Sequence, residues 1–182
     1  VPKTSKNSCE LTLVPHTAHR NLKVSDSNGK VTRMKKELKY PDHPDRFDNW
    51  KQLLCRNGLT GRCYWEVEWT GLVHVAVTYR GIGRKGKGFD CRFGRNDQSW
   101  CLNCSENGFT VLHDNKSTDV RLQSSSGRVA VYVDCPAGSL SFYRVSSDTL
   151  IHLHTFSTTF TEPLYPGFGI LMPGSSVSLC RM

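Results

Sequence analysis

Residues 61–69 constrain the fold of this chain more than any other stretch. Small or apolar side chains alternate there with polar ones, and two of the chain's four tryptophans fall within it. A β-strand points successive side chains to opposite faces. One face would carry Cys63, Trp65, Val67 and Trp69, and the other Arg62, Tyr64, Glu66 and Glu68. This pattern predicts a strand of an antiparallel sheet, with the apolar face in a core and the polar face near water.

Strand-like segments continue along the chain and are separated by short turn sequences. Many short strands with frequent turn residues are typical of a β-sandwich or barrel. No segment has convincing helical periodicity, so we expect only short helical turns, near residues 17–22 or 43–47. The expected strands cover residues 9–13, 30–33, 62–69, 73–79, 89–93, 99–103, 109–113, 119–122, 128–134, 139–145, 150–156, 164–170 and 177–180.

The length of 182 residues suits one all-β domain, and we expect residues 1–182 to form it. The chain contains no run of about 18 apolar residues, so no membrane-spanning helix is expected. It starts at Val1 without an initiator methionine and without a signal-peptide pattern. We therefore expect a piece of a longer or processed protein.

Eight cysteines raise the question of metal binding or disulfides. Cys63, Cys91, Cys101 and Cys135 lie in strand-like segments, where a free thiol behaves as a small hydrophobic group. Cys101 and Cys104 form a CxxC pair, but a zinc site needs further ligands and the chain has no second such pair. On a strand the two thiols would also face opposite sides. We expect buried thiols, no metal and no cofactor.

The formal net charge of +8 is concentrated in two parts of the sequence. One group comprises Arg80, Arg84, Lys85, Lys87, Arg92 and Arg95, and the other Lys30, Arg33, Lys35, Lys36 and Lys39. Such a patch suits nucleic acid, anionic lipid or an acidic protein. Charged side chains also simply solvate glycine-rich loops, and without interleaved aromatics we favour that interpretation over RNA binding.

Signatures of catalysis are weak. Residues 81–86 match GxGxxG, but a dinucleotide site needs a long helix after the glycines, and a strand-like segment follows instead. Glu66 and Glu68 would share a strand face as a solvated pair. No GxSxG motif is present, and the seven histidines show no metal-ligand spacing. We expect no catalytic residues and no enzyme activity in this chain.

Ordered sequence blocks make the chain resemble a complete PRY-SPRY domain from about Cys9 to Cys180. They include Leu-Thr-Leu-Val-Pro-His-Thr-Ala-His at 11–19, the strand at 61–68, and Val-Ala-Val-Tyr-Val-Asp with Ala-Gly-Ser-Leu-Ser-Phe-Tyr across 129–143. Residues 100–102, 160–166 and 177–180 continue the match. The resemblance places the PRY portion and a connection at about residues 9–50, and the SPRY portion at about 51–182.

The resemblance implies a bent sandwich of two antiparallel sheets with short N-terminal helical turns, which presents variable loops to a partner protein. Such domains end tripartite-motif ubiquitin ligases, NLR-type innate immune receptors and stonustoxin-type cytolysins. The expectation is a non-catalytic recognition module, the target-selecting C-terminal domain of an intracellular tripartite-motif E3 ligase or NLR-type protein. We expect a cytoplasmic location and a monomeric isolated domain.

Candidate contact residues follow from the same resemblance. Phe160 matches an aromatic that lines the pocket of an antibody-binding relative, whereas Asn103 and Ser105 replace two tryptophans and His74 replaces an acid. Antibody binding is therefore not expected. The candidate partner-binding residues are Phe160, His74, Asn103 and Ser105, with Arg84, Lys85, Lys87 and Arg95 in and beside a variable loop.

Two alternatives remain open at this point. The basic loops would serve RNA binding, with affinity that falls steeply with salt. The chain would otherwise be the terminal domain of a secreted pore-forming toxin, with oxidised cysteines, for example Cys55 with Cys63, or glycosylated Asn103 and Asn115, each of which begins an Asn-x-Ser sequence.

Overall fold

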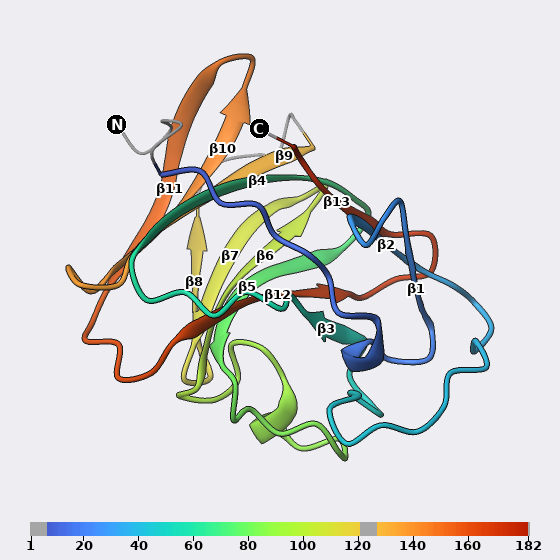
Figure 1. Cartoon of the computed structure of the whole chain (residues 1–182). Coiled ribbons are helices and arrows are strands. Elements are labelled where there is room, and N and C mark those ends of the chain that lie inside the picture. Colours follow the sequence, from blue (N-terminus) through green and yellow to red (C-terminus); the bar gives the residue numbers. More distant parts are fainter. Residues whose placement is uncertain (1–6, 121–126, 182) are drawn as a thin grey trace.

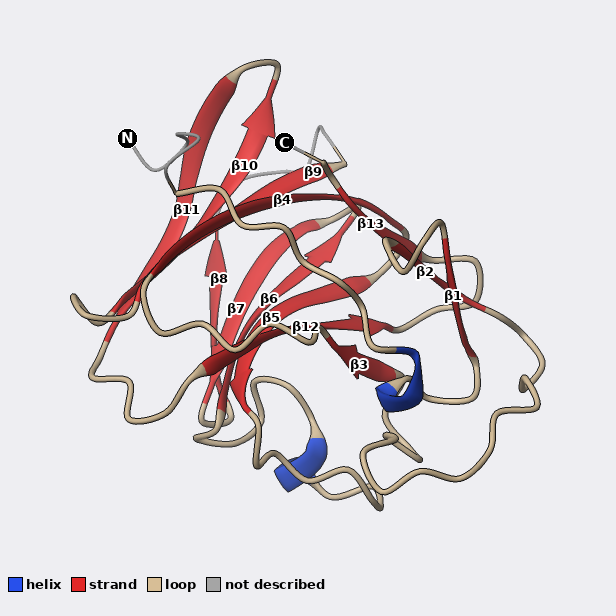
Figure 2. Ribbon diagram, in the orientation of Figure 1, coloured by secondary structure: helices blue, strands red, loops and turns tan. Residues whose placement is uncertain are grey.

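The computed structural model describes residues 7–120 and 127–181, and it is built almost wholly of strands. Two antiparallel sheets lie one over the other, and β4 (Arg62–Thr70) curves across the strands of the second sheet (Figures 1 and 2). This confirms the expected sandwich of two antiparallel sheets.

The first sheet has seven strands, all paired antiparallel. Their order is β1 (Leu22–Ser25), β2 (Lys30–Arg33), β13 (Ser176–Leu179), β4, β9 (Arg128–Asp134), β10 (Ser139–Ser146) and β11 (Thr149–Ser157). The N-terminal strands β1 and β2 therefore extend one edge of a sheet whose other strands come from the middle and end of the chain.

The second sheet has six strands, also antiparallel. Their order is β3 (Gln52–Leu54), β12 (Leu164–Ile170), β5 (Val73–Tyr79), β6 (Ser99–Ser105), β7 (Gly108–His113) and β8 (Lys116–Val120). The expected strand at 119–122 partly lies outside the described residues.

The core between the sheets contains the residues that alternation assigned to it. Trp65, Val67 and Trp69 of β4 are buried, as are Trp100 of β6 and Phe142 of β10. Burying such large side chains supplies roughly 25 cal/mol per Å² of apolar surface. The assignment of the apolar face of β4 to the core is confirmed.

The other face of β4 differs from the expectation of a solvated surface. Tyr64 is 0% exposed and Glu66 only 1% exposed, whereas Glu68 is exposed. The Tyr64 hydroxyl donates to Glu66 Oε2 at 2.5 Å, and Arg128 Nη1 donates to Glu66 Oε1 at 3.3 Å. A carboxylate can be buried when charged and hydrogen-bonding partners meet it. The prediction that Glu66 faces water was wrong.

Several expected elements are also corrected. Residues 9–13 are not a strand, because only Leu13 forms an isolated bridge, next to another at Ser8, and Phe89–Cys91 is a 3-10 turn where a strand was expected. The other helical turn is Pro15–Thr17, just before the expected 17–22, and 43–47 is not helical. Strands β1 and β3 were not anticipated as such; they have only four and three residues.

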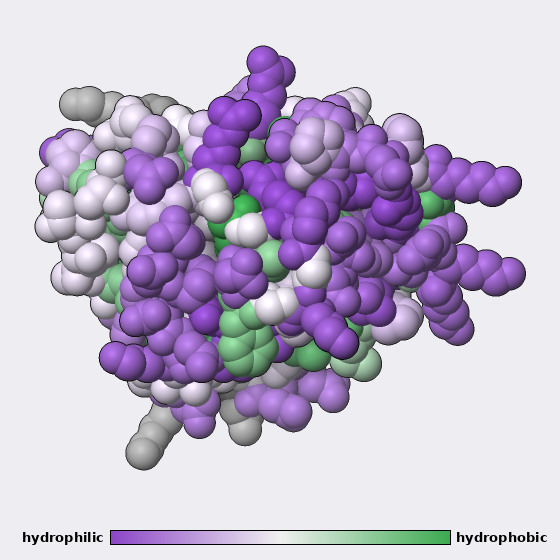
Figure 3. All heavy atoms as spheres, turned by 90° about the horizontal axis from the view of Figure 1, so that it is seen from below, coloured by the Kyte–Doolittle hydropathy of each residue, from purple (hydrophilic) through white to green (hydrophobic). Residues whose placement is uncertain are grey.

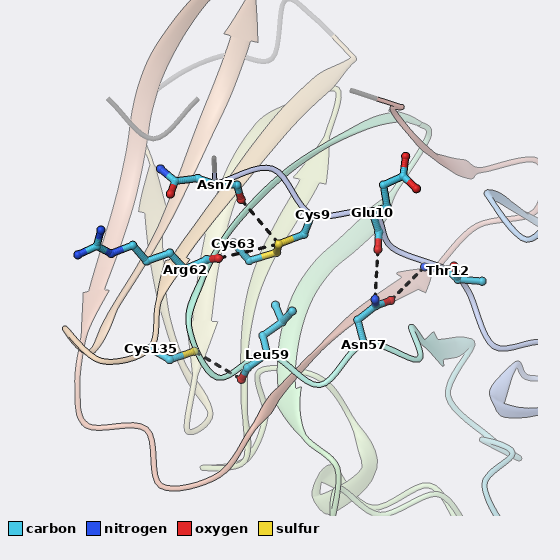
Figure 4. Close-up of a disulfide and its surroundings, with 9 residues drawn as sticks. All are labelled: Asn7, Cys9, Glu10, Thr12, Asn57, Leu59, Arg62, Cys63 and Cys135. Atoms are coloured by element: carbon cyan, nitrogen blue, oxygen red, sulfur yellow. Dashed lines mark hydrogen bonds between the residues drawn. A yellow bond between two sulfur atoms is a disulfide. The ribbon is translucent and has the colours of Figure 1, made fainter. Parts of the chain in front are cut away.

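The cysteines form one disulfide among the described residues, between Cys9 and Cys63 (Figure 4). It ties the N-terminal segment to β4, and Asn57 joins the same segment by accepting from the Thr12 amide at 3.2 Å. Cys63 is therefore not a free thiol, and Cys55 is a buried free one, so the example pairing of Cys55 with Cys63 was wrong.

The CxxC pair behaves as strand geometry requires. Cys101 packs in a small outer cluster with Leu54 and Phe93, and Cys104 packs in the core between the sheets. Burial raises the pKa of both thiols, so they stay protonated at neutral pH. Within the described residues, no helix is long and apolar enough to cross a membrane.

Candidate functional site

The basic loop, residues 80–97, folds down on the outer side of the six-stranded sheet. Ile82 and Phe93 of this loop are buried with Phe47 from the β2–β3 connection and with Ala76 of β5. Figure 3 views this end of the molecule from below, where hydrophilic side chains surround a few hydrophobic ones. The loop is therefore packed over a small core of its own.

Two candidate cations, Arg84 and Lys85, hold this loop to the β2–β3 connection. Arg84 Nη1 donates to the Asp45 carbonyl at 2.7 Å, and its guanidinium lies 5.1 Å from the Phe47 ring centroid. Lys85 Nζ donates to the His43 carbonyl at 2.8 Å and to the Arg46 carbonyl at 2.7 Å. These contacts give Arg84 and Lys85 a structural role, and their role in partner binding stays a prediction.

The outer part of the loop presents an aromatic and cationic surface. Phe89 is 49% exposed and lies 6.5 Å from the Trp50 ring, centroid to centroid. Arg92 lies over Trp50 at 4.6 Å and Arg95 over Phe89 at 5.8 Å. Lys87 is exposed beside them. Phe47, by contrast, is 0% exposed and packs beneath the loop.

A hollow of about 270 Å³ lies next to this surface, on the outer face of the six-stranded sheet. Its polar lining comprises His74, Arg92, Arg95, Asn103, Thr110 and Ser117, and we call it the cationic hollow. His74, Asn103 and Thr110 stand side by side on three neighbouring strands, because β5 pairs with β6 and β6 with β7 at these residues. The structure thus brings together three candidate residues, His74, Asn103 and Arg95.

His74 is neutral in this setting. It is only 3% exposed, and burial together with Arg92 and Arg95 lowers its pKa to about 3. A hydrogen bond with Asn103 acts in the opposite direction and is outweighed. The ring therefore contributes hydrogen-bonding nitrogens to the hollow at neutral pH, and the positive charge comes from the two arginines.

Ser105 and Phe160 lie away from the hollow. The Ser105 hydroxyl contacts the Gly108 carbonyl at 3.3 Å in the β6–β7 turn. Phe160 packs edge-on against Trp100, with 5.1 Å between ring centroids, and lines a separate hollow of about 300 Å³ with Leu59 and Pro136. It is near the Tyr79 end of β5, whereas His74 is near the other end, so the candidate residues do not form one site.

One group of potential metal ligands was not anticipated. Ligand atoms of His16, His43 and Asp45 all lie within 4.8 Å of one another in the described structure. The two rings stack at 4.1 Å, and His43 Nδ1 already accepts from the Asp45 amide at 3.0 Å. Arg46 and Arg84 help lower the pKa of His16, although burial is the largest cause. Nearby guanidinium charges oppose a bound cation as well, so we assign no metal here.

Arg92 and Trp50 were also missed as site residues. Arg92 belongs to the basic run of the sequence, but its position beside His74 depends on the 3-10 turn at Phe89–Cys91. Trp50 lies in the connection before β3 and donates from Nε1 to the Gly88 carbonyl at 3.0 Å. Arg92 and Trp50 are far apart in the sequence, so only the structure reveals this stacking.

Comparison with protein-family models gives two matches that together cover most of the chain. The SPRY-associated domain, PRY, matches residues 11–59, and the SPRY domain matches residues 62–181.

Curated relatives include stonustoxin subunit beta of Synanceia horrida, 45% identical over 88% of this chain and 23% of the toxin subunit. Tripartite motif-containing protein 16 of Mus musculus is 38% identical over 88% of this chain and 29% of the relative. The chain thus spans about a quarter of the length of these curated relatives.

Solved structures give the same result. The stonustoxin structure superposes with a TM-score of 0.89 at 38% identity, over 96% of this chain and 29% of that one. The crystal structure of the TRIM65 PSpry domain has a TM-score of 0.88 at 27% identity and covers 97% of this chain and 93% of that one.

Proposed function

This chain belongs to the PRY-SPRY family, and we propose that it is a non-catalytic module that recognises a partner protein. The observation that carries the proposal is the exposed Phe89 beside Arg95, on a loop held in place by Arg84 and Lys85. Aromatic and arginine side chains on a preorganised surface are the residue types that dominate binding energies at protein interfaces. The ligand face in this proposal comprises residues 80–97 and the outer side of β5–β8.

The parent protein in this proposal is a tripartite-motif E3 ubiquitin ligase or an NLR-type innate immune protein of the cytoplasm, whose target this domain selects. Its support is the 38% identity to tripartite motif-containing protein 16 and the near-complete overlap with the TRIM65 PSpry domain. Any ligase activity would belong to other parts of the parent. We also propose that residues 1–182 act as one domain, monomeric in isolation, because β1 and β2 extend the sheet that contains β4 and β9.

A second candidate is the terminal domain of a secreted pore-forming toxin. It is favoured by the 45% identity to stonustoxin subunit beta and by the Cys9–Cys63 disulfide, since disulfides persist mainly in oxidising compartments. Asn115 is exposed at the β7–β8 turn, where a glycan has room, whereas Asn103 is half-buried in the cationic hollow. Glycosylation of Asn115 in protein recovered from its native source would favour this candidate.

Nucleic-acid binding through the basic loop remains the alternative outcome. Two of the loop's cations, Arg84 and Lys85, already donate to backbone carbonyls, which reduces the charge available to phosphates. Binding of nucleic acid would show strong salt dependence and little sensitivity to an aromatic-to-alanine change on the loop.

The test is retention of binding partners from cytosolic extract, with and without nuclease. We expect wild type to retain a protein regardless of nuclease, and Phe89→Ala to reduce its retention about tenfold or more, as for an interface hot spot. Tyr132→Ala, on the outer face of the seven-stranded sheet, is the matched control and should retain the protein. Phe160→Ala tests separately whether the hollow lined by Phe160 and Leu59 takes part in binding. Retention of nuclease-sensitive material alone would contradict the proposal.

A further inference from the structure

Among the described residues, three buried nitrogen atoms of residues that line the cationic hollow have no hydrogen-bond partner. They are His74 Nδ1, Arg92 Nε and Arg95 Nε. A buried polar group without a partner costs about 1–3 kcal/mol, so folded proteins contain few of them. Others occur elsewhere among the described residues, such as Trp65 Nε1 and Trp69 Nε1 in the core, but here three of them belong to residues that line one cavity.

The hollow also lacks a compensating negative charge. Among the residues that the structure describes, no acidic side chain lines it. Burial and the charge of Arg95 lower the pKa of Arg92, and no carboxylate opposes them. Asp119, on the neighbouring β8, accepts from the Thr110 hydroxyl at 3.2 Å, and Arg95 Nη1 donates to the neutral Asn115 side chain at 3.3 Å. The two guanidinium groups therefore repel each other in a partly desolvated place.

Aromatic and polar contacts nevertheless hold both arginines in place. Arg92 stacks on Trp50, whose indole is fixed by its bond to the Gly88 carbonyl. Asn96 Nδ2 donates to the Arg92 carbonyl at 2.9 Å, which fixes the backbone between the two arginines. Guanidinium groups stacked on rings keep their donors available to a ligand. The conformational entropy of these side chains is therefore already lost in the folded protein, before any ligand binds.

We propose that the cationic hollow binds an oxyanion, a carboxylate or a phosphate group carried by the partner protein. The guanidinium groups of Arg92 and Arg95 supply the positive charge and N–H donors, and His74 and Asn103 supply neutral polar contacts. Charge-assisted hydrogen bonds of arginine to carboxylate or phosphate are the strong class of such bonds. This inference rests on the proposed function, because it names the chemistry of the partner at the same face.

The test needs no partner protein and therefore fails independently of the proposed function. The ¹⁵N-labelled chain is titrated with sodium phosphate and, separately, with sodium acetate, and sodium chloride keeps the ionic strength constant. The Arg Nε–H signals of Arg92 and Arg95 are followed by NMR. We expect saturable shifts of both signals with at least one oxyanion. Comparison of the two dissociation constants shows whether the hollow prefers phosphate or carboxylate.

Variants confirm the place of binding. Arg95→Gln should raise the dissociation constant about tenfold, the factor that corresponds to the loss of one charge-assisted hydrogen bond. Lys23→Gln removes one exposed charge from β1 and should leave it unchanged. Linear, non-saturating shifts in wild type would overturn the inference, whatever the variants do. So would equal affinity in Arg95→Gln and wild type.

Discussion

The outer faces of the two sheets each bury polar groups, but they satisfy them differently. On the seven-stranded sheet, the buried Glu66 receives hydrogen bonds from Tyr64 and Arg128. On the six-stranded sheet, His74 Nδ1 is buried beside Arg92 and Arg95, and no described residue bonds to it. The first cluster is complete within the chain, and the second has donors left over.

This difference indicates which cluster stabilises the fold and which is available to bind a ligand. A completed buried network is destabilised when one member is removed, because the others lose their partners. An incomplete cluster of one charge sign costs stability and gains from a ligand that completes it. We therefore assign a structural role to the Glu66 cluster and a ligand-binding role to the cationic hollow.

The seven-stranded side also has a covalent brace, the Cys9–Cys63 disulfide, which joins residues 54 positions apart. Closing a loop of this length stabilises the folded state by about 4 kcal/mol in the chain-entropy model. Reduction, or Cys9→Ser, should lower the free energy of unfolding by about that amount in urea titrations, and Cys135→Ser serves as the control. Eight titratable thiols in the unreduced, denatured protein would contradict the brace.

Single substitutions in the two clusters should have effects of different size. Glu66→Ala leaves the buried Tyr64 hydroxyl without its acceptor and should cost about 3 kcal/mol of unfolding free energy. Arg95→Gln removes a charge that lacks a carboxylate partner and should change stability by less than about 0.5 kcal/mol. Urea unfolding of both variants measures the contrast. Equal destabilisation by the two changes would remove the distinction between the faces.

Acid should destabilise the six-stranded side through His74. Its pKa is about 3 in the folded state against an ordinary value of 6.5, so the unfolded chain binds more protons between these values. Stability contributed by neutral His74 is thus present above pH 6.5 and is lost as the pH falls towards 3, at up to about 1.4 kcal/mol per pH unit. His19, with a pKa lowered to about 4 mainly by burial, acts in the same direction.

The measurement is the unfolding free energy between pH 7 and pH 5. His74→Gln should flatten this pH dependence relative to wild type, and the exposed His152→Gln should not. Identical slopes in wild type and His74→Gln would show that His74 titrates normally in the fold.

Phe160 lies outside both clusters and gives the smallest effect on stability. It is half-buried and packs edge-on against Trp100, a contact type that contributes about 1 kcal/mol. Phe160→Ala should therefore lower the thermal midpoint by only a few degrees. A drop of more than about 10 °C would make Phe160 a core residue and remove it as a contact candidate.

Strand alternation predicted the core because burial of Trp65 and Trp69 depends on local pattern alone. It failed for Glu66, whose burial depends on Arg128 from a distant part of the sequence. The turn at Phe89–Cys91 was read as a strand because Phe89, Cys91 and Phe93 alternate with polar residues. The Cys9–Cys63 pairing had no sequence signal, since eight cysteines allow many pairings.

The residues of the cationic hollow were predicted only in part, because the sequence does not show contacts between distant segments. His74, Asn103 and Arg95 were named from the family resemblance, and neighbouring strands with the adjoining loop bring them together. Phe160 was grouped with them, but it lies near the Tyr79 end of β5, away from the hollow. Arg92 was missed because its place depends on stacking against Trp50, a contact between distant loops.

The most direct measurement is hydrogen–deuterium exchange of the chain alone and with its captured partner protein, read by mass spectrometry. We predict slower exchange in residues 80–97 and along β6–β8, with no change in β9–β11. Protection confined to β9–β11, or to the loop that carries Phe160, would contradict the assignment of the ligand face to the six-stranded sheet.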